Sequence, residues 1–144
     1  MISAGAVKTY DPSQVHIIFG PLILTGYADG TFVNVNRKED MFSLQIGTSG
    51  EGTRSKSNNR SGEVMVQLMQ SSDSNAALSE LALADEIGNV GVFPLFIKDN
   101  SGSSIYTAET AWIVKIPDSE FSREAGPREW KFETDVLVAH VGGN

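Results

Sequence analysis

The sequence predicts a mainly β chain, an antiparallel β-sandwich or barrel with one short flanking α-helix. Several segments alternate apolar and polar residues, a pattern typical of strands with one buried face. Only one segment has apolar residues at helical spacing. The 144 residues are 40% apolar and 20% charged, as expected for a globular chain with enough length for one hydrophobic core. We therefore expect residues 1–144 to form a single domain.

Four strands are predicted from alternation alone, because residues two apart share one face of a strand. They cover 32–36 (Val33 and Val35 inward), 41–46 (Phe42, Leu44 and Ile46), 63–70 (Val64, Val66 and Leu68) and 129–138 (Trp130, Phe132, Val136 and Val138). Further strands are expected over 15–24, 92–98, 105–107 and 111–116, with Pro21 and Pro94 indicating edges or bulges. Trp112 and Trp130 are expected in the core.

Two groups of turn residues separate these strands. Ala28-Asp29-Gly30-Thr31 suits a tight hairpin, because Asp and Gly tolerate the positive φ that such a turn needs. Asp99-Asn100-Ser101-Gly102 predicts a second turn.

The predicted helix runs from about Ser74 to Glu86. Leu78 and Leu81 lie at helical spacing among several alanines, which are good helix formers. The residues Ser72, Asp73 and Ser74 offer N-cap oxygens, and Gly88 and Asn89 are able to end the helix.

The segment Gly47–Gly62 is expected to be a long polar loop. It has no apolar side chain to anchor it, and such an insertion is usually either disordered or ordered by a partner. It carries a net charge of +2, which leaves −9 on the rest of a chain whose formal charge is −7. An acidic body with a basic loop favours head-to-tail association of identical copies, although both parts are alternatively plain solvated surface.

The acidic balance argues against tight binding to nucleic acid, which needs Lys and Arg to neutralise phosphates. The N-terminal residues lack the pattern of a signal peptide. The longest apolar stretch, Val15–Leu24, is about half the length of a membrane-spanning helix. We expect no contact with a membrane and synthesis in the cytoplasm. The chain has no cysteine, so disulfides and thiolate metal sites are excluded.

A search for catalytic chemistry finds no site. Gly47–Arg54 lacks the Gly-Lys-Ser/Thr of a phosphate-binding loop. His16 and His140 are not at a metal-ligand spacing, and no serine lies in a Gly-x-Ser-x-Gly motif. Neighbouring carboxylates such as Glu39-Asp40 and Asp85-Glu86 point apart on a strand or a helix. The sequence therefore predicts a protein that is not an enzyme, with no catalytic residue, metal site or cofactor.

Two stretches carry a family resemblance. They are Ser61-Gly62-Glu63-Val64-Met65-Val66-Gln67-Leu68 running into Ser74-Asn75-Ala76-Ala77-Leu78-Ser79, and the closing Glu129-Trp130-Lys131-Phe132. With them, the chain resembles the tail tube proteins of contractile-tailed bacteriophages, which are related to the tube protein of type VI secretion. The resemblance implies a β-sandwich or barrel that assembles into hexameric rings. The rings stack into an inner tail tube for DNA ejection into the host, and a long loop reaches the neighbouring ring.

The resemblance also places residues. We expect Gly47–Gly62 at the ring-to-ring contact, with Arg54, Lys56, Arg60 and Glu51 meeting the next ring. Lumen-facing candidates are the polar strand residues Asn34, Asn36, Ser43, Gln45, Glu133 and Asp135, and the general acidity suits a lumen through which DNA slides without binding. The alternative for each residue is an ordinary solvent-facing position on a sheet.

The implied partners are further copies of the chain, the tail sheath protein, the baseplate or initiator, and the tail terminator. Genomic DNA would pass through the lumen without specific binding, and the protein would be located in the virion tail. Two other hypotheses stay open. One is another phage structural protein, such as a tail terminator or capsid decoration protein. The other is a monomeric β-sandwich binding module with exposed aromatic residues beside a groove.

Overall fold

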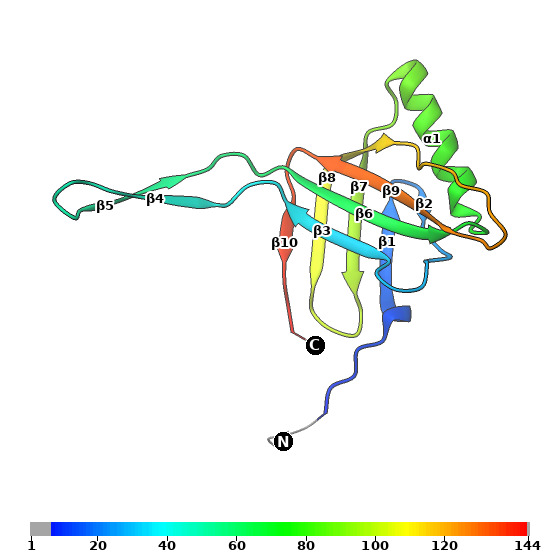
Figure 1. Ribbon diagram of the computed structural model, residues 1–144, viewed down its shortest axis with the longest axis horizontal. Helices are drawn as coiled ribbons and strands as arrows, with labels where there is room; N and C mark the ends of the chain where they lie inside the picture. The colour runs from blue at the N-terminus through cyan, green and yellow to red at the C-terminus, as the bar shows by residue number, and fades with distance from the viewer. Residues whose placement is uncertain (1–6, 144) are drawn as a thin grey trace.

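Antiparallel strands organise most of the chain in the computed structural model, which describes residues 7–143 (Figure 1). The elements in order are a 3-10 turn (Pro12–Gln14), β1 (Val15–Phe19), β2 (Leu22–Ile23), β3 (Val33–Arg37), β4 (Phe42–Ile46), β5 (Gly52–Lys56), β6 (Gly62–Met69), α1 (Ser74–Gly88), β7 (Phe93–Asp99), β8 (Ile105–Lys115), β9 (Pro127–Thr134) and β10 (Val138–His140). The prediction of a mainly β fold with one flanking helix is confirmed.

One sheet of eight strands folds over on itself. Its order is β2-β1-β7-β8-β9-β6-β3, and β10 pairs with the first part of β8. Figure 1 shows β3, β6 and β9 crossing β1, β7 and β8 as two layers. The edge strands β2 and β3 do not pair with each other among residues 7–143, so the sheet is sandwich-like rather than a closed barrel.

Strand β8 belongs to both layers. Its first half pairs with β7 and its second half with β9, and the pairing register shifts in both halves. Ala108 and Ala111 are both buried while Glu109 and Thr110 between them are exposed, so the alternation breaks there. Two small buried residues let the strand turn from one layer to the other. The predicted strands 105–107 and 111–116 are therefore one bent strand.

The core lies between the layers and confirms most of the predicted inward residues. Val64, Val66 and Leu68 are buried, as are Trp130 and Phe132. They pack against side chains from β1, β7, β8 and α1, namely Val15, Ile17, Phe19, Leu95, Ile97, Ala108, Ala111 and Leu78. Trp112 was wrongly placed in the core: it lies opposite Glu133 on the outer face and is only half-buried.

The helix α1 covers one end of the sandwich and confirms the predicted range, with two more residues at its end. The N-cap residue Asp73 makes no side-chain cap bond, and instead the hydroxyl of Ser72 accepts a hydrogen bond from the amide of Ser74 at 3.2 Å. Asn89 ends the helix in the left-handed conformation with φ of 55°. Leu78 is buried against the core. The helix is too short to cross a membrane, and no other helix occurs in residues 7–143.

The predicted strand over residues 129–138 is interrupted after Thr134. Thr134 continues the buried face of Trp130 and Phe132, and its hydroxyl donates to the carbonyl of Thr110 at 2.7 Å. The chain then bends, and Leu137 rather than Val136 or Val138 enters the core. The prediction of one continuous strand was wrong because a hydrogen-bonded threonine occupies an inward position that the pattern assigned only to apolar residues.

The turn at residues 28–31 is not the predicted hairpin. The amide of Ala28 donates to the carbonyl of Gln67, and the amide of Gln67 donates to the carbonyl of Phe32. Both sides of the turn therefore lie against one residue of β6, and the segment forms a bulge on the edge of the sheet. Gly30 has the positive φ that was expected, 86°.

The predictions for the second turn and for the two prolines are confirmed. Asp99–Gly102 forms the β7–β8 turn, where the amide of Gly102 donates to the carbonyl of Asp99 at 3.2 Å. Pro94 lies at the register shift between Phe93 and Leu95, and Pro21 lies in the turn between β1 and β2.

The segment Gly47–Gly62 is not a loop throughout. Residues 52–56 form β5, which pairs with β4 in a sheet of two strands, and only residues 47–51 make the turn between them. Figure 1 shows this β4–β5 hairpin projecting away from the two layers. The expected half-buried strand at 41–46 is consequently exposed along its whole length, because no second layer covers it.

Candidate assembly surfaces

The β4–β5 hairpin has two chemically different faces. The register pairs Phe42 with Lys56 and Leu44 with Arg54, so these four residues share one face with Ile46. We call this the apolar-basic face. The opposite face carries only uncharged polar side chains from the two strands, namely Ser43, Gln45, Thr53 and Ser55.

The apolar-basic face is exposed to an extent that is unusual for a folded chain. Phe42, Leu44 and Ile46 are 39%, 68% and 62% exposed. The guanidinium of Arg54 lies 4.1 Å from the centre of the Phe42 ring, a cation–π contact that covers one side of that ring only. A contiguous exposed apolar stripe with flanking charges marks an interaction surface.

Polar contacts surround the root of the hairpin. The amide of Ser57 donates to the carbonyl of Met41 at 2.9 Å, and its hydroxyl donates to Glu39 at 3.0 Å. The Arg37 guanidinium donates to the carbonyl of Leu137 through Nη2 at 2.6 Å and Nε at 3.0 Å. The Ser57 contacts therefore join the two segments at the root to each other, and the Arg37 contact ties the end of β3 to the segment between β9 and β10.

The structure brings together only two of the four residues expected at the ring-to-ring contact. Arg54 and Lys56 lie on the apolar-basic face. Glu51 is in the turn at the tip of the hairpin, and Arg60 lies in the segment between β5 and β6. Arg60 lines a cavity of about 300 Å³ that also includes Asp135 and Glu109.

The lumen-facing candidates also divide into separate groups. Asn34, Asn36 and Glu133 lie on one outer face of β3, β6 and β9, since Asn36 is opposite Glu63 and Glu63 is opposite Glu133. Ser43 and Gln45 are on the hairpin instead. Asp135 lies beyond the end of β9, where its carboxylate accepts hydrogen bonds from the Thr110 hydroxyl and the Val136 amide. The Thr110 contact, the larger cause, lowers the pKa of Asp135.

Two ion pairs neutralise most of the acidic residues on the outer face of β3, β6 and β9. Lys131 forms an ion pair with Glu63 at 3.2 Å, and Lys38 forms one with Glu133 at 3.1 Å. Gln67 donates to Glu129 at 3.3 Å. The acidity of the chain is therefore not concentrated on this face.

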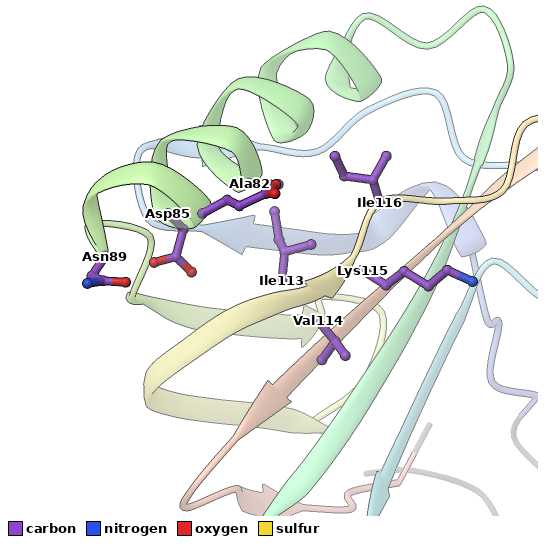
Figure 2. A pocket seen from close by; sticks show the side chains of 8 residues that line it. Ala82, Asp85, Asn89, Ile113, Val114, Lys115 and Ile116 are labelled. Carbon is purple, nitrogen blue, oxygen red and sulfur yellow. The ribbon is translucent and has the colours of Figure 1, made fainter.

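An acidic groove between α1 and β8 was not foreseen from the sequence. Its volume is about 470 Å³. Figure 2 shows Asp85 pointing from α1 toward β8, and Ile113 and Ile116 pointing toward the helix. The lining residues are Ala82, Asp85, Glu86, Asn89, Ile113, Val114, Lys115 and Ile116. The sequence signal that could have indicated this groove is the loss of alternation at 113–116, where three of four residues are apolar.

No arrangement for catalysis or metal binding occurs in residues 7–143. No group of three or more His, Asp or Glu in that range converges on a possible metal position. His16 is on β1 and His140 is on β10, and β7 and β8 separate these strands in the sheet.

Comparison with known proteins decides the family. A family model described as the Bacteriophage PhiTE tail tube protein matches residues 23–142. The chain belongs to this phage tail tube family. A curated relative, "Structural protein ORF10" of Pseudomonas phage KPP10, is 34% identical over 149 residues, which cover 98% of this chain and 86% of that protein. The tail tube family is structural, so the prediction of a structural virion component rather than an enzyme is confirmed.

Solved structures show the same fold at low sequence identity. The sheath/tube terminator of an extracellular contractile injection system has a TM-score of 0.67 at 9% identity, covering 96% of this chain and 100% of the other. The anti-feeding prophage tube terminating cap has a TM-score of 0.64 at 9% identity, covering 96% and 95%. A sheath-tube complex of an extracellular contractile injection system gives 0.61 at 8%, covering 92% and 91%.

Proposed function

We propose that this chain forms the inner tube of a contractile phage tail by stacking hexameric rings, and that the tube conducts DNA into the host. The observation that carries the proposal is the β4–β5 hairpin. It presents an exposed apolar-basic face on a hairpin that projects away from the body. A face of this kind on a phage tail tube family member is suited to joining one subunit to the next.

The free edge of the sheet supports ring formation. Strand β3 is an edge strand of five residues, and its inward residues Val33 and Val35 already pack on the core. An unpaired edge is a site for strand pairing with a second chain, and closure of the sheets around a ring removes such edges. We propose that Asn34, Asn36 and Glu133 then line the lumen, where DNA passes without specific binding.

The proposed partners follow from the same assembly. They are the tail sheath protein on the outside, the baseplate or initiator at one end and the tail terminator at the other. The solved structures of similar fold come from tube, sheath and terminator assemblies, which supports this set. Ser43 and Gln45, on the uncharged hairpin face, are proposed to point away from the ring-to-ring contact.

A tail terminator is the second candidate function. Two of the similar solved structures are a terminating cap and a sheath/tube terminator. A terminator would close into a single ring, whereas a tube protein would polymerise.

Electron microscopy of the concentrated purified protein, and of the particles that contain it, separates the candidates. Hollow tubes of stacked rings are the expected result. Single rings that never stack would favour the terminator, and location of the protein only on a capsid surface would overturn both.

A further inference from the structure

The acidic groove and the apolar-basic face of the hairpin are complementary in chemistry. We propose that the apolar-basic face of one copy docks into the groove between α1 and β8 of a second copy. The inference rests on the proposed function, because it names the surface that receives the hairpin in the stacked assembly.

Charge is the first argument for this pairing. The helix α1 carries Glu80, Asp85 and Glu86 and no basic residue. Asp85 and Glu86 lie on the wall of the groove. Arg54 and Lys56 stand beside the apolar stripe of the hairpin, so they reach an acidic wall when the stripe is docked. The one basic residue of the groove, Lys115, forms an ion pair with Asp118 at 3.0 Å, which offsets its charge.

Apolar matching is the second argument. Val114 and Ile116, on the sheet side of the groove, remain exposed. The stripe from Phe42 to Ile46 spans four residue steps, or about 13 Å at roughly 3.3 Å per residue. On the receiving copy, Ile113 and Val114 at the end of β8 and Ile116 just after it are the apolar residues that line the sheet side of the groove. Docking would remove both exposed apolar surfaces from water.

The groove of the same subunit is out of reach of its own hairpin. Figure 1 shows the hairpin leaving the body on the side away from α1. The contact is therefore between two copies and joins different surfaces of each. A head-to-tail contact of this kind continues from copy to copy instead of closing as a dimer.

Engineered disulfides test the contact directly, because the chain has no cysteine of its own. The test variant combines Leu44→Cys on the apolar-basic face with Ile116→Cys in the groove. The control combines Gln45→Cys on the uncharged face with the same Ile116→Cys. A disulfide requires Cα atoms within about 7 Å, so cross-linking reports true proximity. Both variants are concentrated, mildly oxidised, and examined on non-reducing gels and by electron microscopy.

The expected result is a ladder of covalent multimers for the test variant and loss of that ladder for the control. Two results would overturn the groove as the docking site without contradicting the tube function. One is tubes that form without a ladder from the test variant, and the other is equal ladders from both variants. A ladder specific to the test variant without rings or tubes would contradict the tube function and support the hairpin contact. Material that gives neither ladder nor assembly would contradict both.

Discussion

The indole nitrogen of Trp130 donates a hydrogen bond to the side-chain oxygen of Asn75 at 2.9 Å, and this contact ties α1 to β9. Asn75 in turn donates to the carbonyl of Met69 at 2.9 Å. Trp130 is fully buried, and its indole N–H has Asn75 as its acceptor. We predict that Asn75→Ala lowers the free energy of unfolding by about 1–3 kcal/mol, the cost of leaving a buried donor without an acceptor.

Chemical denaturation checks this prediction. Glu80→Ala, on the exposed side of the same helix, is the control and is expected to change the stability by less than about 0.5 kcal/mol. Equal effects of the two substitutions would show that the Trp130–Asn75 bond does not stabilise the fold.

Gly62, at the start of β6, has no room for a side chain. A Cβ atom there would lie 2.5 Å from Cδ2 of Leu137 and 3.0 Å from the backbone oxygen of Asn36. Gly62→Ala is therefore expected to destabilise the protein by about 1–3 kcal/mol through overpacking. Thermal unfolding measures the loss, and Gly126→Ala, where a Cβ meets nothing within 4 Å, is the control. An unchanged midpoint for Gly62→Ala would contradict the predicted clash.

The Thr110–Asp135 hydrogen bond predicts a pH effect. It lowers the pKa of Asp135 from its ordinary value of 3.8, so its contribution to stability is present above that pH and is lost as the pH falls through the lower folded value. Thr110→Val should raise the pKa of Asp135, and the variant should differ from wild type in stability at neutral pH but not in strong acid. NMR titration of the Asp135 carboxyl carbon measures the shift, with Thr107→Val as control. If Thr110→Val leaves the pKa of Asp135 unchanged, the Thr110 hydrogen bond is not the cause of the lowered pKa.

The charges of the apolar-basic face are predicted to act in assembly and not in folding. Arg54→Gln with Lys56→Gln should abolish or strongly reduce tube formation, because both cations lie beside the docking stripe. Thr53→Glu with Ser55→Glu changes the net charge by the same amount on the opposite face and should leave assembly nearly intact. Sedimentation and microscopy provide the readout, with circular dichroism to verify the fold. Equal assembly of both variants would contradict the prediction.

The body is predicted to fold without the hairpin. The core residues all lie outside 42–56, and the amide of Ser57 already bonds to the carbonyl of Met41. Replacing residues 42–56 with Asn-Gly, a two-residue hairpin turn, should change the unfolding free energy by less than about 1 kcal/mol, because loop length has a weak effect on stability. Denaturation tests the fold and microscopy tests assembly, which should be absent. An unfolded variant would show that the hairpin supports the body.

The sequence predicted what depends on local periodicity. The helix over residues 74–86 and the inward faces of Val64 and Trp130 follow from spacing alone, and all are confirmed. Strand β5 was missed because Gly52–Lys56 has no apolar alternation. Its strand conformation comes from pairing with β4, a contact between separate segments.

Contacts between strands also explain where periodicity alone was insufficient. Trp112 lies on the outer face because the bulge at Glu109 and Thr110 reverses the alternation of β8. The lumen candidates Ser43 and Asn34 have the same pattern in sequence but lie in different sheets. Periodicity identifies which residues share a face of one strand, and it does not identify which layer that strand joins.

The detachment of the hairpin from the body has a kinetic consequence for assembly. A two-stranded hairpin alone in water is marginally stable, so we expect contact with a neighbour to make it more ordered. Two free copies that meet must both lose this conformational freedom, while an existing end already offers an ordered surface. We therefore expect a concentration threshold and a lag before spontaneous growth, and rapid elongation from a preformed seed. Tube length would then be controlled by where growth is allowed to start.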